Sequence, residues 1–415
     1  MKRFLIVFSA ILLAFSINSC QKEKENLPAD AEVHSESKVS SSEENTKPED
    51  EPTEKKISFL AVGDNVMHDS ILADARKNAA ISADTSIKNA GYDFTKLYEN
   101  VKDDIKSADI SFINHEAPVA GDEKGVQGYP IFNSPEIIGD FIEDLGFDIV
   151  NIANNHMLDM DGTYHKDGYK SSIEYWKGKN VLTVGGYESA SDYENIRFIE
   201  KDGIKIAVLS YTEFVNQNAN GSSEGCIVPL FDKAVMARHI KKAKEKCDLV
   251  FVSMHWGNEN TFEITENQKY YAKFLADEGV DVIIGHHSHT IQPIEWIDGK
   301  DGNKTLCIYS LGNFVSTMLD SYNMLEGMVT FDIVKKDEDI HIENVKMTPL
   351  VCHYYGDASV HDNQDLYLRY NAKVYKLSEY TEELCKMHGS SLWGKFDLDT
   401  LKGYVTSTIS KEFLD

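Results

Sequence analysis

The chain has 415 residues, of which 42% are hydrophobic and 10% aromatic, which argues against a disordered protein and is enough to bury a large core in one big domain or two ordinary ones. Its net charge of −26 argues against nucleic acid as a partner, because phosphate binding needs clustered cations. The negative field favours a cationic substrate or a metal ion, although the same charge also serves plain solubility.

The first 20 residues resemble a bacterial lipoprotein signal peptide. A short basic segment at 1–3 precedes an apolar run at 4–17 that is too short for a comfortable transmembrane helix. Small residues precede Cys20, which would be lipidated and become the mature N-terminus. An ordinary signal peptide with an incidental cysteine is the alternative. Both interpretations predict an exported protein. The lipoprotein signal also predicts a lipid anchor on the extracytoplasmic face of the membrane.

The composition of residues 21–56 predicts a disordered tether. They are rich in Glu, Ser, Lys and Pro and hold almost no large apolar residue. Such a segment cannot bury enough surface to offset its ordering entropy. We therefore expect the folded part to begin at Ile57.

From Ile57 onward, strand-like and helix-like segments alternate. Apolar, β-branched runs predict strands at 56–63, 109–116, 147–154, 181–186, 204–211, 248–256, 280–287 and 305–314. Three- and four-residue spacing and cap signals predict helices at 93–107, 135–146, 232–246 and 265–277. This order predicts an α/β fold with ligands at the carboxyl ends of its strands.

The character of the chain changes after Glu326. The sequence there predicts a hairpin that turns at 336–339, followed by a small helical appendage. We therefore predict a main domain over 57–350 and a C-terminal helical extension over 351–415.

Polar residues gather at the predicted strand ends. One polar strand end is usually a turn or a helix cap. Five such exits on one sheet edge instead favour a shared site. The residues at these five exits are Asp64, Asn114, His115, Glu116, Asn154, Asn155, His156, Asp159, His255, Glu259, His286, His287 and His289, and the strand-like run at 305–314 adds Asn313.

Oxygen and imidazole ligands without thiolates suit Mn, Fe, Zn or Mg ions. A carboxylate between several histidines can bridge two ions. Such a centre generates hydroxide and binds the entering and leaving oxygens of a displacement, while a neighbouring histidine protonates the leaving group.

Six motifs occur in a fixed order between about Lys56 and Met347: AVGDNVMH, NHEAPV, ANNHMLD, HWGNEN, GHHSHTIQP and YSLGNFV. With them the chain resembles the CapA family of poly-γ-glutamate capsule biosynthesis, within the calcineurin-like metallophosphatase superfamily. The resemblance implies a layered sandwich of β-sheets flanked by helices. It also implies a phosphoesterase- or amidase-like hydrolase that acts on a cell-envelope polymer or its precursor and uses one or two ions of Mn, Fe or Zn.

The resemblance assigns roles residue by residue. His156 would be the general acid, oriented by Asp159. Glu116 would stand where the phosphatases place a bridging aspartate. The implied metal ligands are Asp64, Glu116, Asn155, His255, His287 and His289, with His68, Asn114 and Asn313 as additional candidates.

Two departures from the family pattern leave the metal count open. Metallophosphatases open with Asp-x-His, but the second residue after Asp64 is Val66, and the bridging carboxylate is a glutamate. A single ion, or none, remains an alternative, and with it a non-catalytic polymer-binding or export subunit whose metal site is vestigial.

The histidine run itself is expected to be extended. His287 and His289, two positions apart, would then point the same way, towards the other ligands. His286 would face the opposite way, as a supporting residue. We expect Gly285 to let the chain turn at the end of the strand.

Overall fold

The computed structural model describes residues 54–162, 166–216, 223, 225–361 and 367–414. The chain divides into two units, Met1–Asp50 and Glu51–Asp415, and all of these residues belong to the second. The predicted signal peptide, the lipidation site Cys20 and the tether as far as residue 53 lie outside the described residues. The first strand begins at Lys55, two residues before the predicted start of the folded part.

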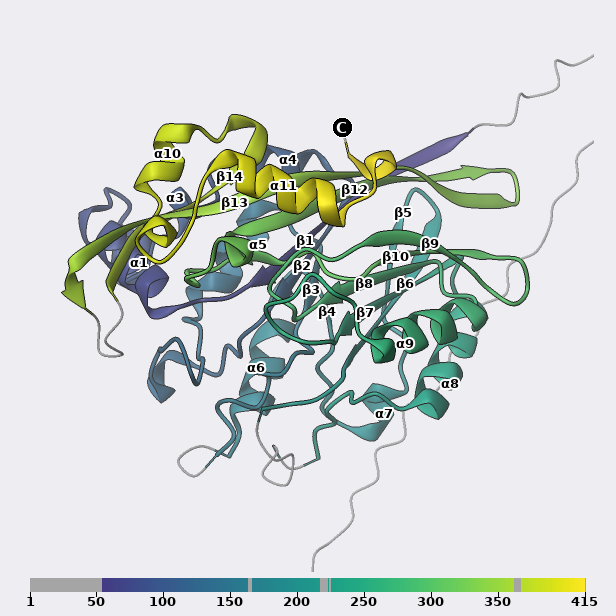
Figure 1. The fold of residues 1–415 in the computed structure, drawn as a ribbon. Helices are drawn as coiled ribbons and strands as arrows, with labels where there is room; N and C mark the ends of the chain where they lie inside the picture. Colours follow the sequence, from purple (N-terminus) through teal and green to yellow (C-terminus); the bar gives the residue numbers. More distant parts are fainter. Residues whose placement is uncertain (1–53, 163–165, 217–222, 224, 362–366, 415) are drawn as a thin grey trace, which may run out of the picture. The chain divides into compact units, whose positions relative to one another are not determined.

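Two β-sheets form the interior of this unit (Figure 1). In the first sheet the order is β14-β13-β12-β1-β2-β3-β4, with β11 beside β1. Its strands are β1 (Lys55–Asn65), β2 (Ile110–His115), β3 (Ile149–Asn151), β4 (Leu182–Val184), β11 (Asn313–Val315), β12 (Leu325–Lys336), β13 (Asp339–His361) and β14 (Tyr367–Lys376). Strands β1 to β4 run parallel, whereas β12, β13 and β14 are antiparallel to their neighbours.

The second sheet has the order β5-β6-β7-β8-β10-β9. Its strands are β5 (Phe198–Lys201), β6 (Ile204–Thr212), β7 (Leu249–His255), β8 (Val282–His286), β9 (Ile294–Asp298) and β10 (Lys304–Ile308). Strands β6, β7, β8 and β10 run parallel, so their carboxyl ends meet at one edge.

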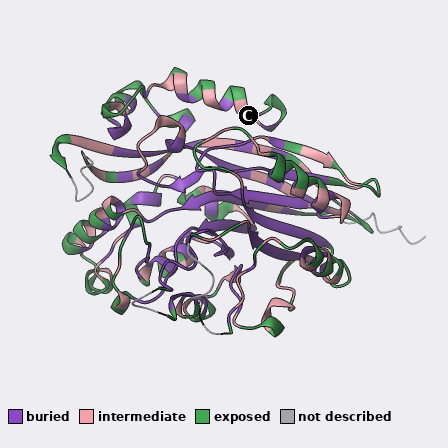
Figure 2. Cartoon of the chain, turned by 60° about the horizontal axis from the view of Figure 1, so that its bottom comes forward, coloured by how far each residue is buried: buried purple, intermediate pink, exposed green. Residues whose placement is uncertain are grey.

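The core lies between the two sheets. Figure 2 shows buried residues concentrated in the strands and exposed residues on the helices. Phe59 of the first sheet stacks on Phe331 at 4.9 Å between ring centroids and meets Phe251 of the second sheet edge-on at 5.2 Å. The sheets therefore share one apolar interior, which supplies the main driving force for folding.

Helices cover the sheets. Alongside the second sheet lie α8 and α9, while α1 and α3 lie near β14 (Figure 1). The helices are α1 (Asp69–Ile81), α2 (Thr85–Ala90), α3 (Thr95–Tyr98), α4 (Lys102–Ser107), α5 (Ile137–Leu145), α6 (Gly168–Lys177), α7 (Ala190–Tyr193), α8 (Lys233–Lys244), α9 (Glu266–Asp277), α10 (Glu382–Met387) and α11 (Leu398–Thr408), with short 3₁₀ turns at Asp122–Lys124, Ser321–Met324, Leu377–Glu379, Gly389–Leu392 and Lys411–Phe413. No helix among the described residues is long and apolar enough to cross a membrane.

Local signals explain the helix ends. Thr265 and Gln268 form a reciprocal capping box at the start of α9, and the Asp232 side chain accepts two backbone N–H groups at the start of α8. Gly146 ends α5 in the left-handed region at φ 96°. The single helix predicted over 93–107 is instead two short helices, α3 and α4.

The predicted division between a main domain ending at 350 and a helical extension beginning at 351 differs from the structure. The hairpin turn at 336–339 is confirmed, but β13 runs straight through residues 350 and 351, and helix α10 begins only at Glu382. The intervening segments are rich in aromatic and β-branched residues, which favour strands, and β14 pairs with β13.

The strand predicted over 305–314 is in fact two strands in different sheets. β10 ends at Ile308, and β11 begins at Asn313 beside β1. Gly312, at φ 71°, lies in the crossing between the sheets. This crossing places Asn313 opposite Asp64.

Candidate metal centre

The carboxyl ends of strands from both sheets meet at one edge. Asp64 near the end of β1 lies opposite Asn114 of β2, and His255 at the end of β7 lies opposite His286 of β8. Glu116 follows β2 directly. Parallel strands bring their ends to the same edge, as the sequence predicts for a shared site.

These side chains form two overlapping groups with the spacing of metal ligands. One group is Glu116, His255 and His287, and the other is Asp64, Glu116 and His289. Within each group the ligand atoms lie within 4.8 Å of one another. Glu116 belongs to both groups, so its carboxylate could help to hold a cation in either one.

Glu116 is the clearest sign that a cation belongs here. Its side chain is completely buried, and neither carboxylate oxygen has a hydrogen-bond partner. Its Oε1 lies 3.6 Å from His255 Nε2 and 3.8 Å from His289 Nε2. Burial and the neighbouring Asp64 raise the pKa of Glu116 well above its ordinary value. Ionised Glu116 would be unfavourable in this buried position, and the positive charge of a divalent cation would offset that unfavourable energy. The residues present therefore fit a metal ion.

Asp64 is held in its ionised form. Burial alone would raise its pKa, but the hydrogen bond with His286 and the nearby imidazoles of His286 and His289 outweigh burial and lower it. Its Oδ2 also accepts the backbone N–H of His287 at 3.1 Å. The surroundings therefore shift the pKa values of these two neighbouring carboxyl groups in opposite directions, that of Asp64 down and that of Glu116 up.

A chain of buried polar groups supports Asp64 from behind. Asn114 Nδ2 donates to Asp64 Oδ1 at 2.7 Å, Asn151 Nδ2 donates to Asn114 Oδ1 at 2.7 Å, and Ser210 Oγ donates to Asn151 Oδ1 at 2.5 Å. This chain crosses from the first sheet to the second. It makes Asn114 a supporting residue, and sequence reasoning missed Asn151 and Ser210. The available signal was a polar residue inside each of two otherwise apolar strands.

The histidine run is not extended, contrary to the prediction. Strand β8 ends at His286, and His287 and His289 have left-handed backbones with φ of 92° and 55°. Both still face Glu116 as predicted, but through a tight turn whose conformation is costly for residues other than glycine. Strain of this kind persists only where the surroundings impose it.

The predictions for His286 and Gly285 also change. His286 stacks near Phe112, and its Nδ1 lies 3.2 Å from Asp64 Oδ1, so it supports the site by contacting Asp64 directly. Gly285 is part of β8 and does not make the turn. A Cβ there would lie 1.9 Å from the carbonyl oxygen of Tyr309, so glycine is needed for close packing.

His156 and Asp159 form a pair beside the two groups. His156 Nδ1 lies 2.7 Å from Asp159 Oδ2, which also accepts the backbone N–H of Phe132 at 2.8 Å. With the Nδ1 proton directed at the carboxylate, Nε2 is the nitrogen left to exchange a proton. Asn155 is adjacent, and its Oδ1 lies 2.8 Å from His255 Nε2.

The remaining candidates, Asn313 and His68, belong to neither of the two groups. Asn313 Oδ1 lies 2.8 Å from His289 Nδ1, which fixes the ring and leaves its Nε2 towards Glu116. His68 lies outside the two groups. Burial lowers the pKa of His68 to about 3, and its Nδ1 accepts the N–H of Thr317 at 3.3 Å.

A cavity of about 810 Å³ adjoins the centre. His68 and Glu259 line it, and Glu259 forms a third group with His287 and His289. The other charged lining residues are Asp69, Asp320 and Arg369, so the walls are more acidic than basic. Tyr129 and Ile131 are exposed apolar residues of the same wall.

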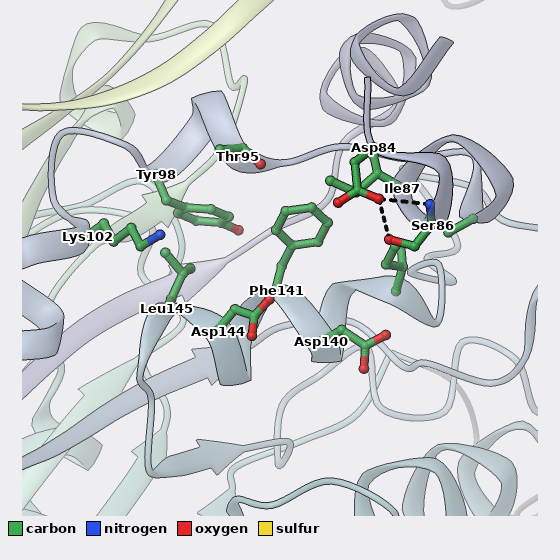
Figure 3. Close-up of a pocket in the computed structure, with 12 residues that line it drawn as sticks. Asp84, Ser86, Ile87, Thr95, Tyr98, Lys102, Asp140, Phe141, Asp144 and Leu145 are labelled. Atoms are coloured by element: carbon green, nitrogen blue, oxygen red, sulfur yellow. Dashed lines mark hydrogen bonds between the residues drawn. The ribbon is translucent and has the colours of Figure 1, made fainter. Parts of the chain in front are cut away.

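A second cavity, of about 370 Å³, lies between α2 and α5 (Figure 3). Figure 3 shows Phe141 between Ile87 and Tyr98, with Asp140 and Asp144 also from α5. None of the predicted site residues lines this cavity. The chemistry therefore belongs to the larger one.

Comparison with known proteins agrees with the motifs. The family model of the bacterial capsule synthesis protein PGA_cap matches residues 58–318. The chain belongs to the PGA_cap family. The matched range contains every residue of the two buried groups, whereas β12, β13, β14 and the C-terminal helices lie outside it.

Two capsule biosynthesis proteins of Bacillus are similar in sequence. The chain is 28% identical to the PGA biosynthesis protein CapA of Bacillus subtilis, over 61% of this chain and 64% of that protein. It is 31% identical to the capsule biosynthesis protein CapA of Bacillus anthracis, over 53% of each chain. The matched part thus spans between about half and two thirds of the length of these relatives.

Among solved structures, a calcineurin-like phosphoesterase of Bacillus subtilis is similar, with 16% identity and a TM-score of 0.41 over 72% of this chain and 91% of that one. A TM-score below 0.5 at this identity identifies neither a shared site nor a shared activity.

Proposed function

We propose that the protein is a metal-dependent hydrolase of the cell envelope that acts in the biosynthesis of a capsule polymer of the poly-γ-glutamate type. The observation that carries the proposal is Glu116, a fully buried carboxylate without hydrogen-bond partners that is common to two groups of metal-binding residues. Family membership and the two capsule biosynthesis relatives support the polymer. The basic, apolar and cysteine-terminated start of the sequence supports export and a lipid anchor at Cys20.

Each side chain has a definite task in this proposal. Asp64, Glu116, His255, His287 and His289 would hold one or two divalent cations, with Asn155 as a further oxygen donor. When bound, such cations supply Lewis-acid activation of water and of the bond to be cleaved.

The other residues position and protonate. Once protonated at both ring nitrogens, His156 would donate the Nε2 proton to the leaving group, while the Asp159 carboxylate accepts the Nδ1 hydrogen bond and stabilises the imidazolium. Asn114 and Asn313 orient Asp64 and His289. The cavity wall of Tyr129 and Ile131 offers apolar contacts to the chain of a bound polymer.

Elemental analysis of the purified protein tests the proposal. After supply of Mn²⁺ or Zn²⁺, we expect one or two ions per chain in the wild type and a loss of binding in the double variant His255→Ala/His289→Ala, which removes one imidazole from each buried group. The exposed His341→Ala variant, on β13, is the matched control and should keep the wild-type metal content.

Activity is then tested on a chromogenic phosphodiester and on a γ-glutamyl amide. Turnover of either substrate should stop with a chelator and return with metal. A wild-type protein that binds no metal would contradict the hydrolase mechanism. Stable metal binding without turnover of either class would instead favour a polymer-binding subunit.

A further inference from the structure

Glu259 has no role in the site described so far, yet it belongs to a third group of metal-binding residues. Together with His287 and His289 it offers ligand atoms within 4.8 Å of one another. His287 also belongs to one of the two buried groups and His289 to the other. The third group therefore overlaps both buried groups.

The three groups differ in their access to solvent. Asp64, Glu116 and His255 are completely buried, whereas Glu259 is exposed and lines the large cavity. A hydrated cation that entered through this cavity would meet the Glu259 carboxylate, which lines it, before the buried Glu116. The net charge of −26 draws cations towards the protein, and a carboxylate at the mouth concentrates them locally.

The loop that carries Glu259 is fastened to the histidine run. The backbone N–H of Asn260 donates to the carbonyl oxygen of Ser288 at 2.7 Å. Asn323 Nδ2 donates both to Asn260 Oδ1 at 2.8 Å and to the carbonyl oxygen of His289 at 3.0 Å. Asn260 has a left-handed backbone at φ 61°, a conformation that asparagine tolerates. The backbone hydrogen bond of Asn260 and the bridging side chain of Asn323 thus hold the loop of Glu259 beside the histidine run.

The charge of Glu259 also reaches the buried centre. It is one of the groups that raise the pKa of Glu116, after burial and Asp64. The outer carboxylate and the buried carboxylate therefore compete electrostatically for the same positive charge.

We propose that Glu259, His287 and His289 form an outer cation position, which a divalent ion occupies in transit between the cavity and the buried centre. A neutral imidazole offers one lone pair, so an ion in the outer position uses the same nitrogens as an ion in the buried groups. The outer position is therefore a relay and not an additional permanent site. This inference rests on the metal centre of the proposed function.

Cobalt uptake by the chelator-treated full chain tests the relay. The visible absorption of bound Co²⁺ is followed by stopped flow in the wild type, in Glu259→Gln and in Glu263→Gln. Glu263 is an exposed glutamate of the same loop that lies outside all three groups, so its variant is a matched control. We expect Glu259→Gln to take up Co²⁺ about tenfold more slowly, with the same final stoichiometry, and Glu263→Gln to match the wild type.

Release distinguishes a relay from an ordinary ligand. Because a relay lowers the barrier in both directions, Glu259→Gln should also release Co²⁺ to excess chelator about tenfold more slowly. Faster release, or the loss of one bound ion at equilibrium, would make Glu259 a permanent ligand and overturn the relay. Wild-type uptake and release rates in Glu259→Gln would overturn it as well. If the wild type binds no Co²⁺, the proposed function fails too, whereas unaltered kinetics in a metal-binding protein contradict the relay alone.

Discussion

Asp159 shows how one residue of the site can be tested apart from the metal ligands. Its Oδ2 lies 2.7 Å from His156 Nδ1 and accepts the N–H of Phe132, so its position is fixed from two sides. Neither Asp159 nor His156 belongs to a group of metal-binding residues. Their loss should therefore affect proton transfer and leave metal binding intact.

We expect His156→Ala to lower kcat by about 10²- to 10⁴-fold, the usual contribution of a positioned general acid. Asp159→Asn should lower kcat in the same direction, because an amide can hold the ring in the wrong tautomer. Steady-state kinetics and elemental analysis on the same preparations check this. A His156→Ala protein that loses its metal would instead place His156 among the ligands.

The buried chain behind Asp64 makes a separate prediction. Asn151→Ala removes the donor to Asn114 Oδ1 and the acceptor for Ser210 Oγ, and leaves both partners buried. Unsatisfied buried polar groups cost about 1–3 kcal/mol each. Urea denaturation of the metal-free protein should therefore show a loss of about 2–6 kcal/mol in the free energy of unfolding. The double variant Asn151→Ala/Ser210→Ala should lose less than the sum of the two single variants, because the two residues share one hydrogen bond.

At the scale of elements, the C-terminal helices are attached to β13 through buried histidines. His353 Nδ1 on β13 lies 2.5 Å from the Tyr380 hydroxyl, and its ring is 5.1 Å from that of His388. His388 accepts the N–H of Ser390 at Nδ1 and contacts the carbonyl oxygen of Cys352 through Nε2. Both histidines are therefore held in neutral form.

This attachment should weaken in acid. Burial, and secondarily the charge of Lys373, lower the pKa of His353 to about 4, and its Nε2 is buried without a partner. The unfolded chain takes up the proton near pH 6.5, so this contribution is fully present above pH 6.5 and is lost as pH falls towards 4. Between pH 6.5 and pH 5 the free energy of unfolding should fall by about 2 kcal/mol because of His353.

Urea denaturation between pH 6.5 and pH 5 measures this loss of stability. His353→Gln should show a shallower pH dependence than the wild type, while the exposed His341→Gln on the same strand should match the wild type. Equal pH dependence in all three proteins would show that His353 is not a neutral buried group.

At the scale of the whole molecule, the charge limits how a polyanion can bind. With a net charge of −26 and more acidic than basic residues on the cavity walls, most of the surface repels poly-γ-glutamate. Contact must therefore be confined to the metal centre and its immediate surroundings, because electrostatic repulsion from the rest of the surface opposes any broader contact. Salt screens this repulsion.

We therefore expect binding of poly-γ-glutamate by the metal-loaded protein to be unchanged or stronger as salt rises from low to physiological concentration, where repulsion is screened. Titration calorimetry at several salt concentrations measures this, with the chelator-treated protein as control. Affinity that increases steadily as salt falls would require a broad basic surface and contradict the prediction.

The sequence by itself predicted the type of fold, the strands that carry the site and most of the chemistry. Polar residues such as Asp64, Glu116 and His255 stand directly at the ends of apolar, strand-like runs, and parallel strands bring such ends together. The turn at 336–339 and the cap at Thr265 were also predictable, because the signals for both are local.

Only the tertiary structure decided the rest. The apolar run at 305–314 gives no sign that it divides between two sheets and so brings Asn313 to Asp64, and Asn151 and Ser210 meet only because the sheets pack together. His287 and His289 were correctly expected to face Glu116 but not through a left-handed turn, since backbone strain of that kind is imposed by the surroundings. Local patterns determine which residues enter a strand or a helix, whereas the contacts between strands distant in sequence are settled when the two sheets bury their shared core.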